Sequence, residues 1–317
     1  MRILGLDIGG TKCAVLLGRY DKGRMTIEGK AVLPTDPTKE PRFVFEAMCR
    51  EADRLLEGEA PDGIGVSCGG PLDPKHGIIQ RPPNLPLWDD TPIVQWLEDR
   101  YHAPARIQND ADACALAEWK LGAGRGTRNM IFLTCGTGLG AGLILNGQLY
   151  RGSSYMAGEV GHVRLSKEGP AGYGKEGSFE GFCSGGGIAQ LGYTMGLSQY
   201  QRGICPSYFS PEQPMGGATA KAVARAAGEG DAAAREVYRK SGRYLGLGLS
   251  VLIDILNPEC IVLGSIFARS EELLRPEMEK ALEEEALPAA LAVCRIVPSE
   301  LGESLGDYAA LITAAEE

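Results

Sequence analysis

The sequence lacks three features that would assign it quickly to a class of protein. Its nine cysteines among 317 residues include no C-x-x-C or C-x-C pair, so the odd, scattered set indicates reduced thiols in a cytoplasmic protein and not a disulfide framework. No apolar run approaches the length of a membrane span. Met1-Arg2 leads directly into the first predicted strand, so we expect no signal peptide.

The sequence also lacks an excess of basic residues, because Asp and Glu number 41 against 32 Lys and Arg. The net charge of −9 disfavours a nucleic-acid-binding surface, which would carry a basic stripe. The hydrophobic fraction of 44% is ordinary for a globular protein, and 317 residues suit two domains with a core in each. We therefore expect two globular domains that bind neither nucleic acid nor a membrane.

Two common phosphate-binding signatures are missing, the Walker G-x-x-x-x-G-K-[ST] loop and the Rossmann fingerprint, in which the turn enters a helix. The sequence instead repeats a strand–glycine turn–strand unit. The first glycine turn is Gly9-Gly10-Thr11-Lys12, and the second glycine turn is Gly136-Thr137-Gly138-Leu139-Gly140. Glycines bring backbone N–H groups close to a ligand, although one such turn alone is commonly a plain hairpin. Its repetition favours a nucleotide triphosphate held between two related domains.

The periodicity of apolar residues predicts alternating strands and helices, which indicates an α/β fold. Predicted strands lie within 2–34 (turning at 21–23), at 63–67, 105–108, within 129–146, and at 260–263 and 292–297. Predicted helices lie at 43–56, 93–101, 111–121, 218–228, 231–256, 270–286 and 304–316, and residues 69–86 and 150–187 are loop-rich. A glycine-rich boundary near 112–128 predicts an N-terminal domain, 1–115, and a C-terminal domain, 116–303, with the final helix (304–317) packed back on the first domain.

Asn109-Asp110 stands at the end of a predicted strand and at the start of a helix. Both residue types are favoured as helix caps. They also suit a ligand site, because α/β proteins bind ligands at strand ends and an aspartate orients the acceptor hydroxyl in many kinases. The dipeptide alone leaves both interpretations open.

A carboxylate, a histidine and a second carboxylate lie in the glycine-rich loop: Glu159, His162 and Glu180. A lone histidine is commonly structural or on the surface. The three together suit sugar hydroxyls, which donate to carboxylates. Metal binding by Glu159 and His162 is the weaker alternative, because no third and fourth ligands stand at suitable spacings.

Several motifs in one order make the chain resemble the ROK family of bacterial sugar kinases and sugar-responsive repressors over essentially its whole length. The motifs are Asp7-Ile-Gly-Gly-Thr-Lys12, Gly69-Gly-Pro-Leu-Asp73, Asn84-Leu85, Asn109-Asp-Ala-Asp-Ala113, Gly136-Thr-Gly-Leu-Gly140, Ala157-Gly-Glu-Val-Gly-His162 and Asn257-Pro-Glu259. The resemblance implies an actin-like ATPase (ribonuclease H-like) fold, with two related domains around an ATP cleft, and a homodimer.

The resemblance also implies roles for individual residues. Asp110 resembles the catalytic base for the sugar 6-hydroxyl. The implied sugar-binding residues are Gly69, Gly70, Asn84, Asn109, Asp110, Glu159, His162 and Glu180. The implied residues for ATP and Mg²⁺ are Asp7, Gly9, Gly10, Thr11, Lys12, Thr137, Gly138 and Gly264, although many relatives carry a second glycine where this chain has Ser265.

The chain departs from the family at one motif. Many members carry C-G-C-G-x-x-G-C-x-E, whose three cysteines bind zinc together with the motif histidine. Here Ala171, Tyr173 and Ser178 stand at the cysteine positions, while Glu180 is kept and Cys183 lies past the motif. We therefore expect no structural zinc, with Tyr173 and Phe179 packing in its place.

These observations predict an ATP- and Mg²⁺-dependent hexose kinase similar to a glucokinase. N-acetylmannosamine, N-acetylglucosamine and fructose stay open as substrates, and Ser67-Cys68-Gly69-Gly70 resembles the version of that motif in N-acetylmannosamine kinases. A ROK repressor is disfavoured because those relatives have an N-terminal helix-turn-helix domain, whereas the first predicted strand starts at residue 2. An actin-like structural or chaperone ATPase is disfavoured by the sugar motif, and saturable hexose binding would distinguish it.

Overall fold

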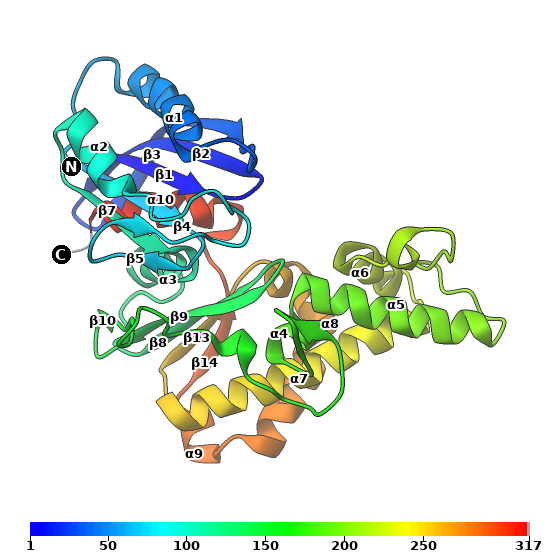
Figure 1. The fold of residues 1–317 in the computed structure, drawn as a ribbon. Coiled ribbons are helices and arrows are strands. Elements are labelled where there is room, and N and C mark those ends of the chain that lie inside the picture. Colours follow the sequence, from blue (N-terminus) through cyan, green and yellow to red (C-terminus); the bar gives the residue numbers. More distant parts are fainter. Residues whose placement is uncertain (316–317) are drawn as a thin grey trace. The chain divides into compact units, whose positions relative to one another are not determined.

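The computed structural model describes residues 1–315. A mixed five-stranded sheet, in the order β3-β2-β1-β4-β7, forms the centre of the N-terminal part (Figure 1). Its first three strands, β1 (Arg2–Ile8), β2 (Lys12–Asp21) and β3 (Arg24–Pro34), are an antiparallel meander. β4 (Gly63–Cys68) and β7 (Ala105–Asn109) then add in parallel, so their carboxyl ends lie at one edge with that of β1.

The two faces of this sheet differ because side chains alternate along β1. Leu4, Leu6 and Ile8 join the core that includes α1 (Pro41–Leu56) and α2 (Ile93–Tyr101). On the other face, α10 (Leu305–Ala314) packs on β1 and β4 and beside α3 (Asp110–Leu121). A Cβ at Gly65 would lie 2.1 Å from the carbonyl oxygen of Ala310. Glycine in β4 is therefore what lets α10 lie directly on the sheet.

The second sheet repeats this strand order as β10-β9-β8-β13-β14. β8 (Met130–Cys135), β9 (Leu139–Leu145) and β10 (Gln148–Leu149) correspond to the meander, and β13 (Cys260–Leu263) and β14 (Arg295–Pro298) to the two parallel strands. The repeated order fits two related domains built on one plan.

Long helices accompany the second sheet. They are α5 (Gly185–Gln201), α6 (Ala220–Gly228), α7 (Ala232–Leu256) and α8 (Ile266–Glu285). α7 and α8 lie side by side (Figure 1), and a Cβ at Gly242 would lie 2.4 Å from the Leu274 carbonyl oxygen. Glycine in α7 thus permits a close helix pair.

Short elements fill the connections. They are β5 (Leu72–Asp73), β6 (Ile78–Ile79), β11 (Ala171–Gly172), β12 (Lys175–Glu176), α4 (Phe179–Cys183), α9 (Pro288–Leu291) and the 3₁₀ helices Val160–His162, Pro214–Gly217 and Gly302–Ser304. The chain divides into two compact units, 1–126 with 142–157 and 300–315, and 127–141 with 158–299.

Most predicted elements are confirmed, including the helix at 93–101 and the turn at Lys22-Gly23. The helix α5 is not among the predicted elements, and α8 begins four residues before the predicted helix at 270. Residues 316–317 of the predicted last helix lie outside the described residues. None of the nine cysteines, all of which lie within the described residues, forms a disulfide bond, and no helix within residues 1–315 is long and apolar enough to cross a membrane.

Candidate functional site

The first glycine turn connects the carboxyl end of β1 to the start of β2. The Gly9 N–H donates to the Lys12 carbonyl at 3.1 Å, and a Cβ at Gly9 would lie 2.9 Å from the same oxygen. Within residues 1–315, the N–H groups of Gly10 and Thr11 donate to no acceptor. Two adjacent backbone donors are therefore available to an anion, as the phosphate interpretation requires.

Asn84 lies against this turn. A Cβ at Gly10 would lie 2.5 Å from the Asn84 Cβ and 2.8 Å from its carbonyl oxygen. The Asn84 loop is fixed by the bonds from the Leu85 N–H to Pro82 and from the Trp88 N–H to Leu85, and by the fully buried Trp88 ring. The structure thus brings a predicted phosphate turn and a predicted sugar residue together, and only glycine fits at position 10.

The ends of β4 and β7 bring together the next predicted residues. Cys68 pairs with Asn109 in the parallel register, so Gly69-Gly70 and Asn109-Asp110 leave the sheet side by side. A Cβ at Gly70 would lie 3.2 Å from Asn109 Nδ2, and one at Gly69 would lie 4.0 Å from Asp110 Oδ2.

Asn109 is the N-cap of α3, so the capping interpretation is confirmed for this residue. Asn109 Oδ1 and Asp110 Oδ1 accept from the Ala111 N–H at 2.9 Å and 2.8 Å. Neither Asn109 Nδ2 nor Asp110 Oδ2 has a hydrogen-bond partner in the described part of the chain. Capping therefore uses one atom of each side chain and leaves the other beside Gly69-Gly70.

The Asp110 carboxylate is open to solvent, yet the surrounding protein atoms reduce its hydration. This desolvation raises its pKa above the ordinary value, and backbone N–H bonds from Ala111 and from Asp110 itself partly offset the rise. A raised pKa makes a carboxylate a stronger proton acceptor.

Asp7 lies near the end of β1, on the face that meets α10. Its pKa rises from the ordinary 3.8 to about 6, first because of burial and then because of the charges of Asp110 and Asp307, while Lys12 and Lys30 lower it. Its carboxylate accepts no hydrogen bond from any of residues 1–315. The site thus holds a half-buried carboxylate that a nearby cation would stabilise.

The second glycine turn connects β8 to β9. The Gly136 N–H donates to the Gly138 carbonyl at 3.1 Å, and the N–H groups of Thr137 and Gly138 have no acceptor among the described residues. Its geometry repeats that of the first turn, with one internal bond and two adjacent unused donors. The repeat seen in the sequence is therefore also a repeat of local structure.

Glu180, in α4, contacts this second turn. Its Oε2 accepts from the Leu139 N–H at 3.0 Å and would lie 2.9 Å from a Cβ at Gly138. Its Oε1 has no bond in the described part of the chain. This contact between Glu180 and Leu139 is not predictable from local sequence, because the two residues are 41 positions apart.

Glu159 precedes the 3₁₀ helix Val160–His162, and His162 is its last residue. This short helix packs against the same region. A Cβ at Gly161 would lie 2.1 Å from the Leu139 carbonyl oxygen and 3.2 Å from the Glu180 Cβ. The three predicted sugar residues of the loop therefore come together at the start of β9.

Gly264 follows β13, beside β8, and its N–H donates to the Leu133 carbonyl at 2.9 Å. Its neighbour Ser265 has φ 44° and ψ −100°, a strained backbone for a residue with a side chain. The start of α5 completes this region, because the Gly185 N–H donates to the Gly136 carbonyl at 2.8 Å and a Cβ at Gly185 would lie 3.1 Å from Ile266. Sequence reasoning missed Gly185-Gly186-Gly187, although a triple glycine is itself a sign of close approach.

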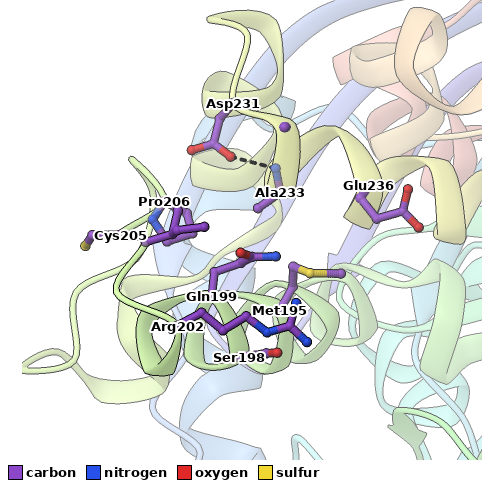
Figure 2. A pocket seen from close by; sticks show the side chains of 11 residues that line it. Met195, Ser198, Gln199, Arg202, Cys205, Pro206, Asp231, Ala233 and Glu236 are labelled. Carbon is purple, nitrogen blue, oxygen red and sulfur yellow. Dashed lines mark hydrogen bonds between the residues drawn. The ribbon is translucent and has the colours of Figure 1, made fainter.

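A separate cavity of about 660 Å³ lies between the second half of α5 and the start of α7 (Figure 2). Met195, Arg202 and Glu236 are among the residues that line it, and Asp231 at its edge caps α7 by accepting from the Ala233 N–H at 2.9 Å. None of the predicted site residues line this cavity, so it is not part of the candidate site.

A family model, the ROK family, matches residues 3–317. The glucokinase of Halalkalibacterium halodurans is 31% identical over 96% of this chain and 92% of its own length. The structure is similar to a ROK hexokinase from Thermus thermophilus, at a TM-score of 0.78 and 30% identity over 99% of this chain and 98% of that one. It is equally similar, at 0.78 and 27% identity over the whole of both chains, to a ROK family glucokinase from Streptomyces griseus in complex with glucose and AMPPNP.

The match spans the whole chain in sequence and in structure, and the repeated mixed sheets agree with it. The expected α/β, actin-like ATPase fold is therefore confirmed, and the chain belongs to the ROK family.

Proposed function

We propose that this chain is an ATP-dependent kinase that phosphorylates the 6-hydroxyl of a hexose, with glucose as the first substrate to test. The observation that carries the proposal is Asp110, whose Oδ2 stays unbonded beside Gly69 while its Oδ1 is held by the helix cap. A fixed carboxylate with one free oxygen and a raised pKa can orient the acceptor hydroxyl and take its proton.

The phosphates of ATP would be held by the two glycine turns, whose unused N–H groups at Gly10, Thr11, Thr137 and Gly138 match the oxygens of an anion. Lys12, exposed at the first turn, would add a positive charge. Gly264 would lie at the adenosine. Such contacts act by positioning the phosphates and stabilising their charge.

Asp7 would lie near Mg²⁺ through water. The fit rests on its half-buried carboxylate, which has no hydrogen-bond donor among residues 1–315 and whose pKa is raised to about 6, first by burial and then by the charges of Asp110 and Asp307. When bound, Mg²⁺ neutralises charge on the phosphates.

The sugar would be bound by two sets of side chains. Asn84, Asn109 and Asp110, with the backbone of Gly69 and Gly70, form one set. Glu159, His162 and Glu180 form the other. Glu180 is suited to a hydroxyl because Leu139 occupies only one of its oxygens.

Glucose leads because the glucokinase of Halalkalibacterium halodurans and the glucose-bound Streptomyces griseus enzyme match this chain over nearly its whole length. The motif that suggested an N-acetylmannosamine kinase gives less support in the structure. Ser67 is 2% exposed within β4, so its hydroxyl belongs to the core and is not offered to a sugar. N-acetylhexosamines and fructose remain alternatives for the assay.

The purified protein should be tested with ATP, Mg²⁺ and a panel of glucose, fructose, mannose, allose and the two N-acetylhexosamines, measuring ADP release and identifying the product by ³¹P NMR. We expect turnover with at least one sugar, and a 6-phosphate as product. Saturable sugar binding without turnover would instead favour a sugar sensor, the non-catalytic role of ROK repressors. Turnover of ATP without sugar binding would favour an actin-like ATPase.

We also propose a homodimer in the cytoplasm. The family resemblance supports the dimer, and nine cysteines without a disulfide bond fit a reducing compartment. Light scattering of the purified protein at several concentrations tests the oligomeric state, because a dimer doubles the 33.7 kDa mass of the chain.

A further inference from the structure

A two-stranded hairpin lies directly against His162. β11 and β12 pair Gly172 with Lys175, which leaves Tyr173 and Gly174 as the two-residue turn. Both turn residues have positive φ, 45° and 73°, as in the tight turns that favour hairpins. Tyr173 is 76% exposed, yet its ring packs edge-on against the His162 ring, with centroids 6.4 Å apart.

The hairpin also holds the backbone of His162. Lys175 Nζ donates to the His162 carbonyl at 2.7 Å, and Arg164 Nη1 donates to the Glu176 carbonyl at the same distance. Farther along, the Leu165 N–H donates to the Gly177 carbonyl at 2.9 Å. The segment that begins with His162 is thus joined to the hairpin by side-chain and main-chain bonds, and Lys175 supplies the charged one.

This is the segment where the family resemblance implies a zinc ion, and the residues present do not fit one. Ser178 is fully buried and caps α4 by accepting from the Gly181 N–H at 3.1 Å. Ala171 exchanges two backbone bonds with the Gln190 amide, at 3.0 Å and 2.8 Å. Within residues 1–315, no group of three His, Cys, Asp or Glu side chains could hold a metal ion. The positions that carry zinc-binding cysteines in relatives therefore have other contacts here, Ala171 with Gln190, Tyr173 with His162 and Ser178 with Gly181.

We propose that Lys175 and Tyr173 are positioning residues, which fix the backbone and the ring of His162 for sugar binding without a metal ion. The inference rests on the sugar-binding role proposed above for His162. The charged bond of Lys175 orients the carbonyl, and the edge of the Tyr173 ring limits rotation of the imidazole.

The test uses Lys175→Met, which keeps the aliphatic stem but removes the donor, and Tyr173→Asn, which removes the ring while tolerating positive φ. Lys175→Arg should restore the donor, and Lys167→Met, an exposed lysine of the same loop, is the matched control. We expect a three- to tenfold rise in the KM for sugar in Lys175→Met and Tyr173→Asn, with kcat and the KM for ATP within twofold. The control and Lys175→Arg should match the parent. In a His162→Ala background, neither substitution should have a further effect.

A second readout does not depend on activity. The chain has three histidines, so the His162 ring proton resonances can be assigned by their loss in His162→Ala. They should move in Lys175→Met and Tyr173→Asn, but not in Lys167→Met. Unmoved resonances would overturn the proposal, whatever the kinetics. Moved resonances with an unchanged KM for sugar would show that the hairpin positions His162 but that the sugar-binding role of His162 is wrong. About one zinc per purified chain would overturn the metal-free part.

Discussion

Replacing Asp7 by asparagine should stabilise the fold at neutral pH, although Asp7 belongs to the proposed site. Its pKa rises from 3.8 to about 6 in the folded chain, so keeping it ionised at pH 7.5 costs about 3 kcal/mol of folding free energy, at about 1.4 kcal/mol for each pKa unit. Below pH 3.8 the carboxyl is protonated in both the folded and the unfolded chain, so the folded chain bears none of this cost. The free energy of unfolding then falls as the pH rises from 3.8 through 6. Asparagine cannot ionise, so it avoids this loss.

Urea unfolding at pH 7.5 and pH 5, without nucleotide, measures the effect. Asp7→Asn should gain about 1–3 kcal/mol at pH 7.5 and roughly half of that at pH 5, where the parent is mostly protonated. Asp21→Asn, an exposed aspartate at the end of β2, is the control and should change stability by less than about 0.5 kcal/mol. An Asp7→Asn chain that is less stable than the parent at pH 7.5, or that gains equally at both pH values, would refute the assigned desolvation.

Other substitutions test the geometry. Gly10→Ala should raise the KM for both ATP and sugar at least tenfold, because its Cβ would meet Asn84 at 2.5 Å. Unchanged KM values would contradict the close packing of the first glycine turn against the Asn84 loop. Gly138→Ala should cost less, since its nearest neighbour is the side-chain Oε2 of Glu180 at 2.9 Å and not backbone, and a larger loss than in Gly10→Ala would contradict this. Ser265→Gly should raise unfolding free energy by about 1 kcal/mol in urea melts by relieving strain at φ 44°, and a loss would contradict the assigned strain.

The strands and their turns were predictable because their signals are local. Apolar alternation and the turn glycines locate β1 and β2, and the family motifs locate Asn109-Asp110 at a strand end. The register of parallel strands then brings Gly69 and Asp110 together without further information.

The helix α5 could not be predicted from local propensity. Glycine inside a helix costs about 1 kcal/mol, and Gly185–Gln201 contains several. The structure shows what offsets this cost: a Cβ at Gly192 would lie 2.8 Å from Val223, and one at Gly196 would lie 2.3 Å from Phe209. Packing partners distant in the sequence decide this helix.

Contacts between residues far apart in the sequence could not be predicted either, and one of them adds a second role for a site residue. The family resemblance implies only a sugar-binding role for Glu180, but its Oε2 also accepts from the Leu139 N–H of the second glycine turn. Glu180→Gln keeps an acceptor at this position, so it separates the loss of charge from the loss of that bond.

The most direct test of the central claim compares the parent with Asp110→Asn in steady-state phosphorylation of the preferred hexose, together with the KM values for sugar and ATP. Asparagine keeps the acceptor for the Ala111 N–H but cannot take a proton, so kcat should fall by roughly 10²–10⁴-fold, with both KM values within threefold of the parent. A kcat within threefold of the parent would contradict the role of Asp110 as the base.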